Sequence, residues 1–126
     1  MAIPTAIGIV LPDDIAETLP EYTDQGEAIK KLFSKMSDNV VTVNCFDNMM
    51  QHRDEYLYFR TDHHWTALGA YYAYTSFCDI KGIAPHKLSQ FQTRTFEGFV
   101  GTHYSETNSA LLKANPDTIT DYIPMG

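Results

Sequence analysis

Short apolar runs alternate with a stretch of helical periodicity in the first part of the chain. Residues 5–11 (TAIGIVL) are apolar up to Pro12, and residues 40–45 (VVTVNC) form a second run that is rich in β-branched side chains. Both runs are typical of short buried strands. Residues 24–36 begin with the spacing of a capping box and continue with apolar side chains at helical intervals, which predicts a helix with one buried stripe. The order strand, helix, strand predicts a right-handed βαβ unit and a parallel sheet.

The most regular helical pattern covers residues 66–81. Thr66 suits the N-cap, Gly82 suits the position after the last turn, and Pro85 follows shortly afterwards. The side chains expected on the buried face are apolar or small: Ala67, Ala70, Tyr71, Tyr74, Phe77 and Cys78. The pattern therefore predicts a long helix that packs on the core through this face.

Five further segments have weaker patterns. In chain order, we interpret them as a loop (13–23), a short helix (46–53), a short strand or an aromatic-lined loop (55–60), a hairpin (93–104) and a last strand (118–123). No repeat or low-complexity segment divides the sequence. The expected fold is therefore one α/β domain over residues 1–126, with a small parallel sheet flanked by helices.

Composition supports a folded domain and excludes some partners. Hydrophobic residues make up 44% of the 126 residues, and the formal net charge is -7. No basic block is present, so nucleic acid is not an expected partner. No apolar stretch is long enough for a transmembrane helix, and the N-terminus does not have the pattern of a signal peptide. The two cysteines, Cys45 and Cys78, lack metal-site spacing and are expected to be buried free thiols.

The residues best suited to chemistry are Asp62, His63, His64 and Trp65, which come directly before the long helix. A carboxylate beside an imidazole can select the tautomer of the ring and stabilise its protonated form. Either histidine could then act as a general base, and Trp65 could limit the access of water. The alternative is structural, with Asp62 as an acid at the helix start and both histidines as surface residues.

The stretch YFRTDHHWTALGAYYAY resembles the signature of the bacterial DHHW-motif proteins, which are similar to SGNH-type hydrolases and to alginate O-acetyltransferases with a D-x-H-W motif. The segments GIVLPDDIAETLP, FEGFVGTHYSET and DTITDYIP resemble other blocks of the family. The resemblance implies an incomplete SGNH-like, flavodoxin-like layer. It also implies a serine-type ester hydrolase or O-acyltransferase that acts on a cell-envelope glycan outside the cytoplasm.

In this resemblance Asp62 would orient the base, His64 would be the general base, and His63 would fill a variable position without a role. We expect Trp65 and Tyr58 to contact the substrate. The resemblance implies neither a metal nor an organic cofactor.

The serine nucleophile of such a family would follow a later strand. We therefore expect it beyond Gly126 and interpret the chain as part of a larger protein that supplies the Asp-His pair. Within the chain Ser105 is the best substitute, although it has the features of an ordinary loop serine. Ser76, inside the predicted long helix, is a poorer one because its hydroxyl would bond to its own backbone.

A metal-dependent phosphoesterase of the DHH type is one alternative function. Its possible ligands are the two histidines of the motif with Asp62, together with other acids and histidines: Asp13, Asp14, His52, His86 and His103. Neither an H-x-x-x-H nor a C-x-x-C spacing supports zinc, so no metal site is predicted.

A second alternative is a non-catalytic module that binds carbohydrate or a partner through aromatic side chains. The sequence has eight tyrosines and one tryptophan. The tyrosines nearest the motif are Tyr56, Tyr58, Tyr71, Tyr72 and Tyr74. Aromatic side chains also supply much of the buried area of a small core, so the sequence leaves this alternative, and the oligomeric state, open.

Overall fold

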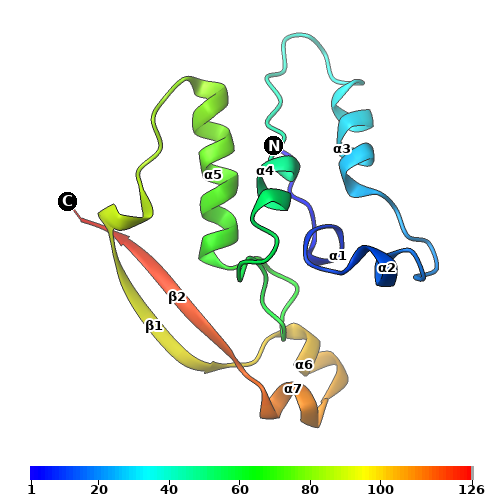
Figure 1. The fold of residues 1–126 in the computed structure, drawn as a ribbon, viewed down its shortest axis with the longest axis vertical. Coiled ribbons are helices and arrows are strands. Elements are labelled where there is room, and N and C mark those ends of the chain that lie inside the picture. The colour runs from blue at the N-terminus through cyan, green and yellow to red at the C-terminus, as the bar shows by residue number, and fades with distance from the viewer. Residues whose placement is uncertain (126) are drawn as a thin grey trace.

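A computed structural model of the chain describes residues 1–125. Its elements in chain order are α1 (Ala6–Ile9), α2 (Asp13–Ala16), α3 (Gln25–Phe33), α4 (Phe46–Gln51), α5 (Ala67–Lys81), the 3-10 turn η1 (Leu88–Gln90), β1 (Phe91–Phe99), α6 (Thr102–Thr107), α7 (Ala110–Ala114) and β2 (Asp117–Pro124). Helix α5 lies between the N-terminal helices and the two strands, and α6 and α7 lie together at one end of the molecule (Figure 1). Over these residues the chain is a small domain of mixed helices and strands.

The two strands form an antiparallel sheet. Phe91 pairs with Pro124, Thr95 with Thr120, and Phe99 with Asp117. Helices α6 and α7 connect the strands, so residues 93–104 are not the hairpin that the sequence predicts. The last predicted strand is confirmed, because residues 118–123 lie within β2.

The predicted parallel sheet is wrong. Residues 5–11 contain α1, and residues 40–45 contribute only an isolated parallel bridge between Asn44 and Ala2. The Gln25 side chain accepts a hydrogen bond from the backbone N–H of Thr5 and donates one to its hydroxyl, which holds this segment against the start of α3. Periodicity alone does not distinguish a short apolar strand from a buried helical turn. Accordingly, the expected SGNH-like layer is not seen in residues 1–125.

The capping signals are confirmed. Asp24 accepts a hydrogen bond from the backbone N–H of Glu27 at the start of α3, and Thr66 accepts one from Gly69 at the start of α5. Gly82 ends α5 in the left-handed conformation, with φ of 65°. Two weaker predictions need adjustment, since α4 is shorter than residues 46–53 and the expected loop 13–23 contains α2.

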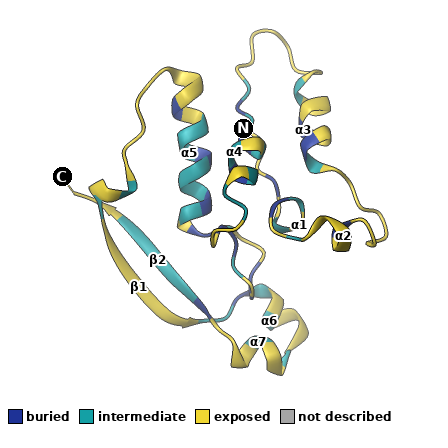
Figure 2. Cartoon of the chain, viewed as in Figure 1, coloured by how far each residue is buried: buried dark blue, intermediate teal, exposed yellow. Residues whose placement is uncertain are grey.

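The core lies where α1, α4 and α5 meet. Its buried residues are Ile9, Cys45, Met49, Leu57, Tyr58 and Ala73. Both cysteines are free and buried, as predicted. Figure 2 shows that burial is concentrated in this region and that β1 is exposed along most of its length. None of the helices within residues 1–125 is long and apolar enough to cross a membrane.

The buried face of α5 differs from the predicted one. Gly69, Ala73 and Cys78 are the buried residues of this helix, and Gly69 lies so close to the backbone of Leu57 that a methyl group there would overlap its carbonyl oxygen. Tyr71 and Tyr74, with neighbouring small residues of α5, instead line an open groove beside Tyr122 of β2. One face of α5, with Gly69, Ala73 and Cys78, thus packs on the core, and the face with Tyr71 and Tyr74 lines the groove.

Candidate active site

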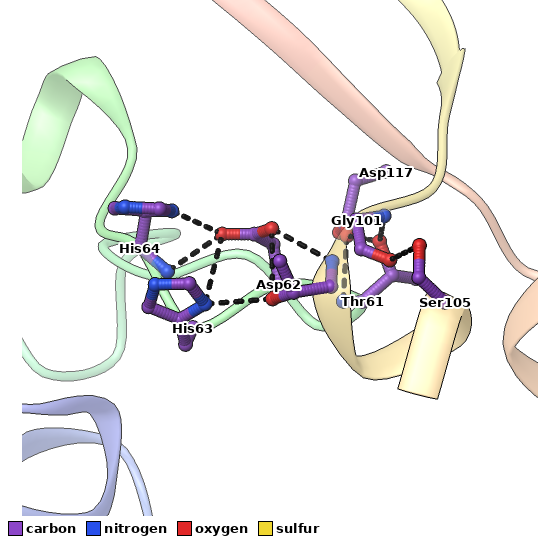
Figure 3. Close-up of polar contacts among 8 residues, drawn as sticks. Thr61, Asp62, His63, His64, Gly101, Ser105 and Asp117 are labelled. Atoms are coloured by element: carbon purple, nitrogen blue, oxygen red, sulfur yellow. Dashed lines mark hydrogen bonds and ion pairs between the residues drawn. The ribbon is translucent and has the colours of Figure 1, made fainter. Parts of the chain in front are cut away.

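The candidate site is the turn at residues 60–65, which precedes α5. Three elements that are distant in sequence hold this turn: the start of α5, the start of α6 and the first residue of β2 (Figure 3). Thr61 and Asp62 are buried, whereas His63 and His64 are exposed. The turn therefore places a buried carboxylate directly beneath two accessible imidazoles.

Asp62 and His64 form a hydrogen-bonded pair. The Oδ1 atom of Asp62 lies 2.6 Å from Nδ1 of His64 and also accepts the backbone N–H of His64 at 2.8 Å. The side chain of His64 is 65% exposed, so the ring edge opposite Asp62 faces solvent. This is the arrangement of an oriented general base with a free edge.

The other oxygen of Asp62 is held by the start of α6. Its Oδ2 atom accepts the backbone N–H of Thr102 at 2.8 Å and the Thr102 hydroxyl at 3.1 Å. Burial by itself would raise the pKa of Asp62, but the hydrogen bonds from Thr102 and His64 outweigh burial and hold the pKa well below its ordinary value. Asp62 is therefore a carboxylate across the physiological pH range.

His63 belongs to the same cluster, although the resemblance in the sequence implies no role for it. Its Nδ1 atom lies 2.6 Å from the Thr102 hydroxyl and 3.9 Å from Oδ1 of Asp62. Its ring packs against that of His64, with centroids 3.9 Å apart and an angle of 37° between the planes. One possible ligand atom from each of Asp62, His63 and His64 lies within 4.8 Å of the others.

Asp117 holds the turn through hydrogen bonds to Arg60 and Thr61. This fully buried residue accepts the backbone N–H of Thr61 at 2.7 Å and the Thr61 hydroxyl at 2.6 Å, and its other oxygen accepts Arg60 and the hydroxyl of Tyr56. Burial raises the pKa of Asp117, yet the hydrogen bonds from Thr61, Tyr56 and Arg60 lower it to about 2. Asp117 could not be predicted from the sequence, because Thr61 is 56 residues away and nothing near Asp117 in the chain indicates this partner.

Gly101 is required for close packing at the site. Its backbone N–H donates to the Thr61 hydroxyl at 3.0 Å, and a Cβ atom at this position would overlap Cβ and Oδ2 of Asp62. Gly101 and Thr102 were also not predicted as site residues. The only local signal was a glycine directly before a helix-forming segment, which is a weak one.

The two residues expected to contact substrate have different environments. Tyr58 is 5% exposed and donates its hydroxyl to the carbonyl oxygen of Pro4 at 2.5 Å, and burial raises its pKa. The ring of Tyr58 lies in the core, and its contact with substrate stays a prediction. Trp65 is partly buried, pairs with Tyr58 through an isolated bridge and packs against the core, and its contact with substrate stays a prediction.

The other candidate residues from the sequence do not contact the Asp62–His64 pair. Ser105 donates its hydroxyl to the carbonyl oxygen of Gly101 and lies on the far side of Asp62 from His64 (Figure 3). Asp13 pairs with Arg53, and His52 pairs with Glu55. His103 is nearer, since its ring centroid lies 6.4 Å from that of His63.

The family model described as DHHW protein matches residues 1–126. The chain belongs to the DHHW family. This DHHW chain is similar to the crystal structure of a DHHW family protein from Eubacterium siraeum, with 40% sequence identity and a TM-score of 0.86. The match covers 99% of this DHHW chain and 40% of the Eubacterium siraeum protein, so the chain spans less than half of that relative's length. No curated protein matches it.

Proposed function

We propose that the Asp62–His64 pair is the acid-base part of a serine-type ester hydrolase or O-acyltransferase that acts on a cell-envelope glycan outside the cytoplasm. The observation that carries the proposal is the 2.6 Å contact between Oδ1 of Asp62 and Nδ1 of His64, combined with the exposed far edge of the imidazole. The resemblance of the Asp-x-His-Trp spacing to the motif of alginate O-acetyltransferases supports the reaction class. The glycan rests on that resemblance alone.

The hydrogen bond to Asp62 determines how His64 would work. Because Asp62 is ionised it can only accept, so Nδ1 of His64 carries the proton and Nε2 of the neutral ring keeps its lone pair. Nε2 would take the proton of a serine hydroxyl as that oxygen attacks the acyl carbon. It would then return the proton to the leaving alkoxide, while Asp62 stabilises the charged ring between the two steps.

Both the attacking serine and the oxyanion donors belong to other parts of the protein in this proposal. Ser105 is a poor nucleophile for His64, because its hydroxyl bonds to its own helix and lies across Asp62 from the ring. The reaction needs a donor pair for the oxyanion as well as the base. The Asp62–His64 pair supplies orientation and proton transfer.

The phosphoesterase alternative gains less support. It needs several acidic ligands around the histidines, but Asp13 is engaged by Arg53 in an ion pair of 3.1 Å. Both oxygens of Asp62 are already occupied by hydrogen bonds from His64 and Thr102. We therefore favour ester chemistry.

Acetate release from an O-acetylated glycan, by the protein that carries this chain, tests the proposal. Replacing the base (His64→Gln) or its orienting acid (Asp62→Asn) should lower kcat by about 10²–10⁴-fold, the usual contribution of general acid-base catalysis. His52→Gln is the matched control, because His52 pairs with Glu55 away from the turn. A wild-type rate in folded His64→Gln protein would contradict the proposal.

A further inference from the structure

We infer that His63 and His64 together form an exchangeable site for a borderline divalent metal ion of the zinc class, bound through their Nε2 atoms. The inference concerns the exposed side of the cluster, where the proposed ester chemistry uses Nε2 of His64 and gives His63 no role. The sequence spacing predicts no resident metal, and this site is of a different kind because both of its ligands are solvent-exposed and come from adjacent residues.

The contact with Asp62 determines the tautomer of His64. Asp62 is a buried carboxylate that accepts from Nδ1 of His64 at 2.6 Å. The proton of the neutral ring therefore lies on Nδ1, and Nε2 has the free lone pair. A metal-binding histidine usually donates its second nitrogen to a carboxylate, a backbone carbonyl or water in this way, and that contact raises the basicity of the ligand.

The tautomer of His63 follows from Thr102. The Thr102 hydroxyl donates to Oδ2 of Asp62 at 3.1 Å, because a hydrogen bond to a charged acceptor is the stronger choice for its single proton. The hydroxyl must then accept the proton of Nδ1 of His63, which lies 2.6 Å away. Nε2 of His63 is consequently unprotonated in the neutral ring as well.

The two rings also have suitable positions. Their centroids are 3.9 Å apart, and both rings lie on the side of Asp62 opposite Thr61 and Ser105 (Figure 3). Their side chains are 57% and 65% exposed, so an ion can approach both rings from solvent. Zinc–nitrogen bonds are about 2.0–2.1 Å long, so a tetrahedral site would place the two Nε2 atoms about 3.3 Å apart.

Charge favours a cation at this position. Asp62 supplies a negative charge directly behind the rings, and the chain as a whole has a formal net charge of -7. His103, whose ring centroid is 6.4 Å from that of His63, is the nearest further imidazole and is exposed. Two or three imidazoles with an outer carboxylate are a borderline ligand set, which suits Zn²⁺ better than Mg²⁺ or Ca²⁺.

Zinc binding would regulate the proposed base. An ion on Nε2 of His64 occupies the lone pair that would accept the serine proton, so Zn²⁺ should inhibit acyl transfer. This consequence rests on the proposed function, whereas the binding of the ion does not.

Isothermal titration of the full chain with ZnCl₂, in a chelator-free buffer that does not bind metals, tests the inference. Wild type should bind about one equivalent, and His63→Ala and His64→Ala should each weaken binding by at least about tenfold. The matched control is His52→Ala, which removes an imidazole outside the cluster and should bind zinc as wild type does. Circular dichroism of each variant confirms the fold.

Three results would overturn the inference: no saturable binding of zinc by wild type, wild-type affinity in folded His63→Ala protein, or equal weakening by His52→Ala. Thr102→Val provides a second variant that retains both histidines and removes only the hydroxyl that orients His63, and it should weaken binding by several-fold. The titration measures heat and not turnover, so it is independent of the proposed function. Zinc binding without acetate release would contradict the proposed function and leave the zinc site supported. Acetate release that depends on His64, without zinc binding, would contradict the zinc site and leave the proposed function supported.

Discussion

At the scale of single residues, the site depends on how Asp62 is kept ionised while buried. Transfer of a carboxylate out of water is costly unless hydrogen bonds replace its hydration. Four donors do so here, two from His64 and two from Thr102. The same four bonds orient the carboxylate, so small changes in its surroundings should affect His64 directly.

Gly101→Ala tests this dependence. The added methyl group would overlap Cβ and Oδ2 of Asp62, so we expect the carboxylate to move and the contact with His64 to lengthen or break. The ¹⁵N NMR signal of Nδ1 of His64 should lose its hydrogen-bonded shift. The melting temperature should fall by about 3–15 °C, since overpacking costs about 1–3 kcal/mol. An unchanged imidazole signal would show that the site adapts to the methyl group.

Ser105→Ala tests whether the chain contains its own nucleophile. The Ser105 hydroxyl bonds to the carbonyl oxygen of Gly101 at 3.3 Å, so we expect no change in hydrolysis of p-nitrophenyl acetate and a stability within about 0.5 kcal/mol of wild type. We also expect the chain by itself to show negligible esterase activity above the imidazole background. An activity that disappears in folded Ser105→Ala protein would identify Ser105 as the reacting group.

At the scale of elements, the turn at residues 60–65 is held by segments that enter it from other parts of the chain. Strand β2 contributes Asp117 at its first position, and α6 contributes the backbone of Thr102 at its start. The carbonyl oxygen of Thr61 in turn accepts the backbone N–H of His103. The turn and the two elements should therefore lose their structure together.

Asp117→Asn tests this coupling through its pH dependence. The pKa of Asp117 is lowered to about 2 in the folded chain, so its contribution is present above the unfolded-state pKa near 4 and is lost as the pH falls through about 2. The contribution is about 2 kcal/mol. Urea unfolding between pH 5 and pH 2 should show a weaker loss of stability for Asp117→Asn than for wild type.

The control for this measurement is Asp121→Asn on the same strand. Asp121 pairs with Arg94 at the surface, where both side chains are substantially exposed, and an exposed ion pair contributes at most about 1 kcal/mol. This variant should keep the acid sensitivity of wild type. Equal acid sensitivity in Asp117→Asn and wild type would show that Asp117 does not anchor the turn.

At the scale of the whole molecule, the core is small and lies on one side of α5. Six buried residues from α1, α4, α5 and the segments beside them form it. The other side of α5 faces the open groove beside the strands, which Tyr71 and Tyr74 line. The free energy of unfolding should therefore depend strongly on side chains on the core side of α5 and weakly on those that line the groove.

Comparison of Leu57→Ala with Tyr71→Ala tests this asymmetry. Leu57 is fully buried, and its truncation should cost about 2–5 kcal/mol of unfolding free energy. Tyr71 is only partly buried, and its hydroxyl donates to the carbonyl oxygen of His86, so its truncation should cost at least about 1 kcal/mol less than that of Leu57. Urea unfolding measures both, with Leu111→Ala at a 73% exposed position as the control.

The sequence alone predicts a large cost for Tyr71→Ala, because Tyr71 lies on the apolar face of the expected helix. A loss of about 3–5 kcal/mol, equal to or above that of Leu57→Ala, would show that this face is packed in solution. The comparison thus decides which face of α5 is the stabilising one.

Local features of the site and fold could be predicted from the sequence. The caps at Asp24 and Thr66 and the end of α5 at Gly82 were correct, as was the expectation that Asp62 and His64 form a pair before a helix. The hydrogen-bond partners of Asp24, Thr66 and Asp62 lie within three residues of them in the chain. The end of α5 depends on the preference of Gly82 for the left-handed backbone conformation. Such interactions form at short chain separation, where little conformational entropy opposes them.

Long-range features were decided only by the tertiary structure. Residues 5–11 and 40–45 satisfy a strand pattern, yet the packing around Ile9 and Cys45 places them in a helical turn and an irregular segment. Thr102 and Asp117, which hold the turn, lie 40 and 56 residues from their partners. The choice of such partners depends on the free energy of the whole packed arrangement, which local periodicity and propensity do not encode.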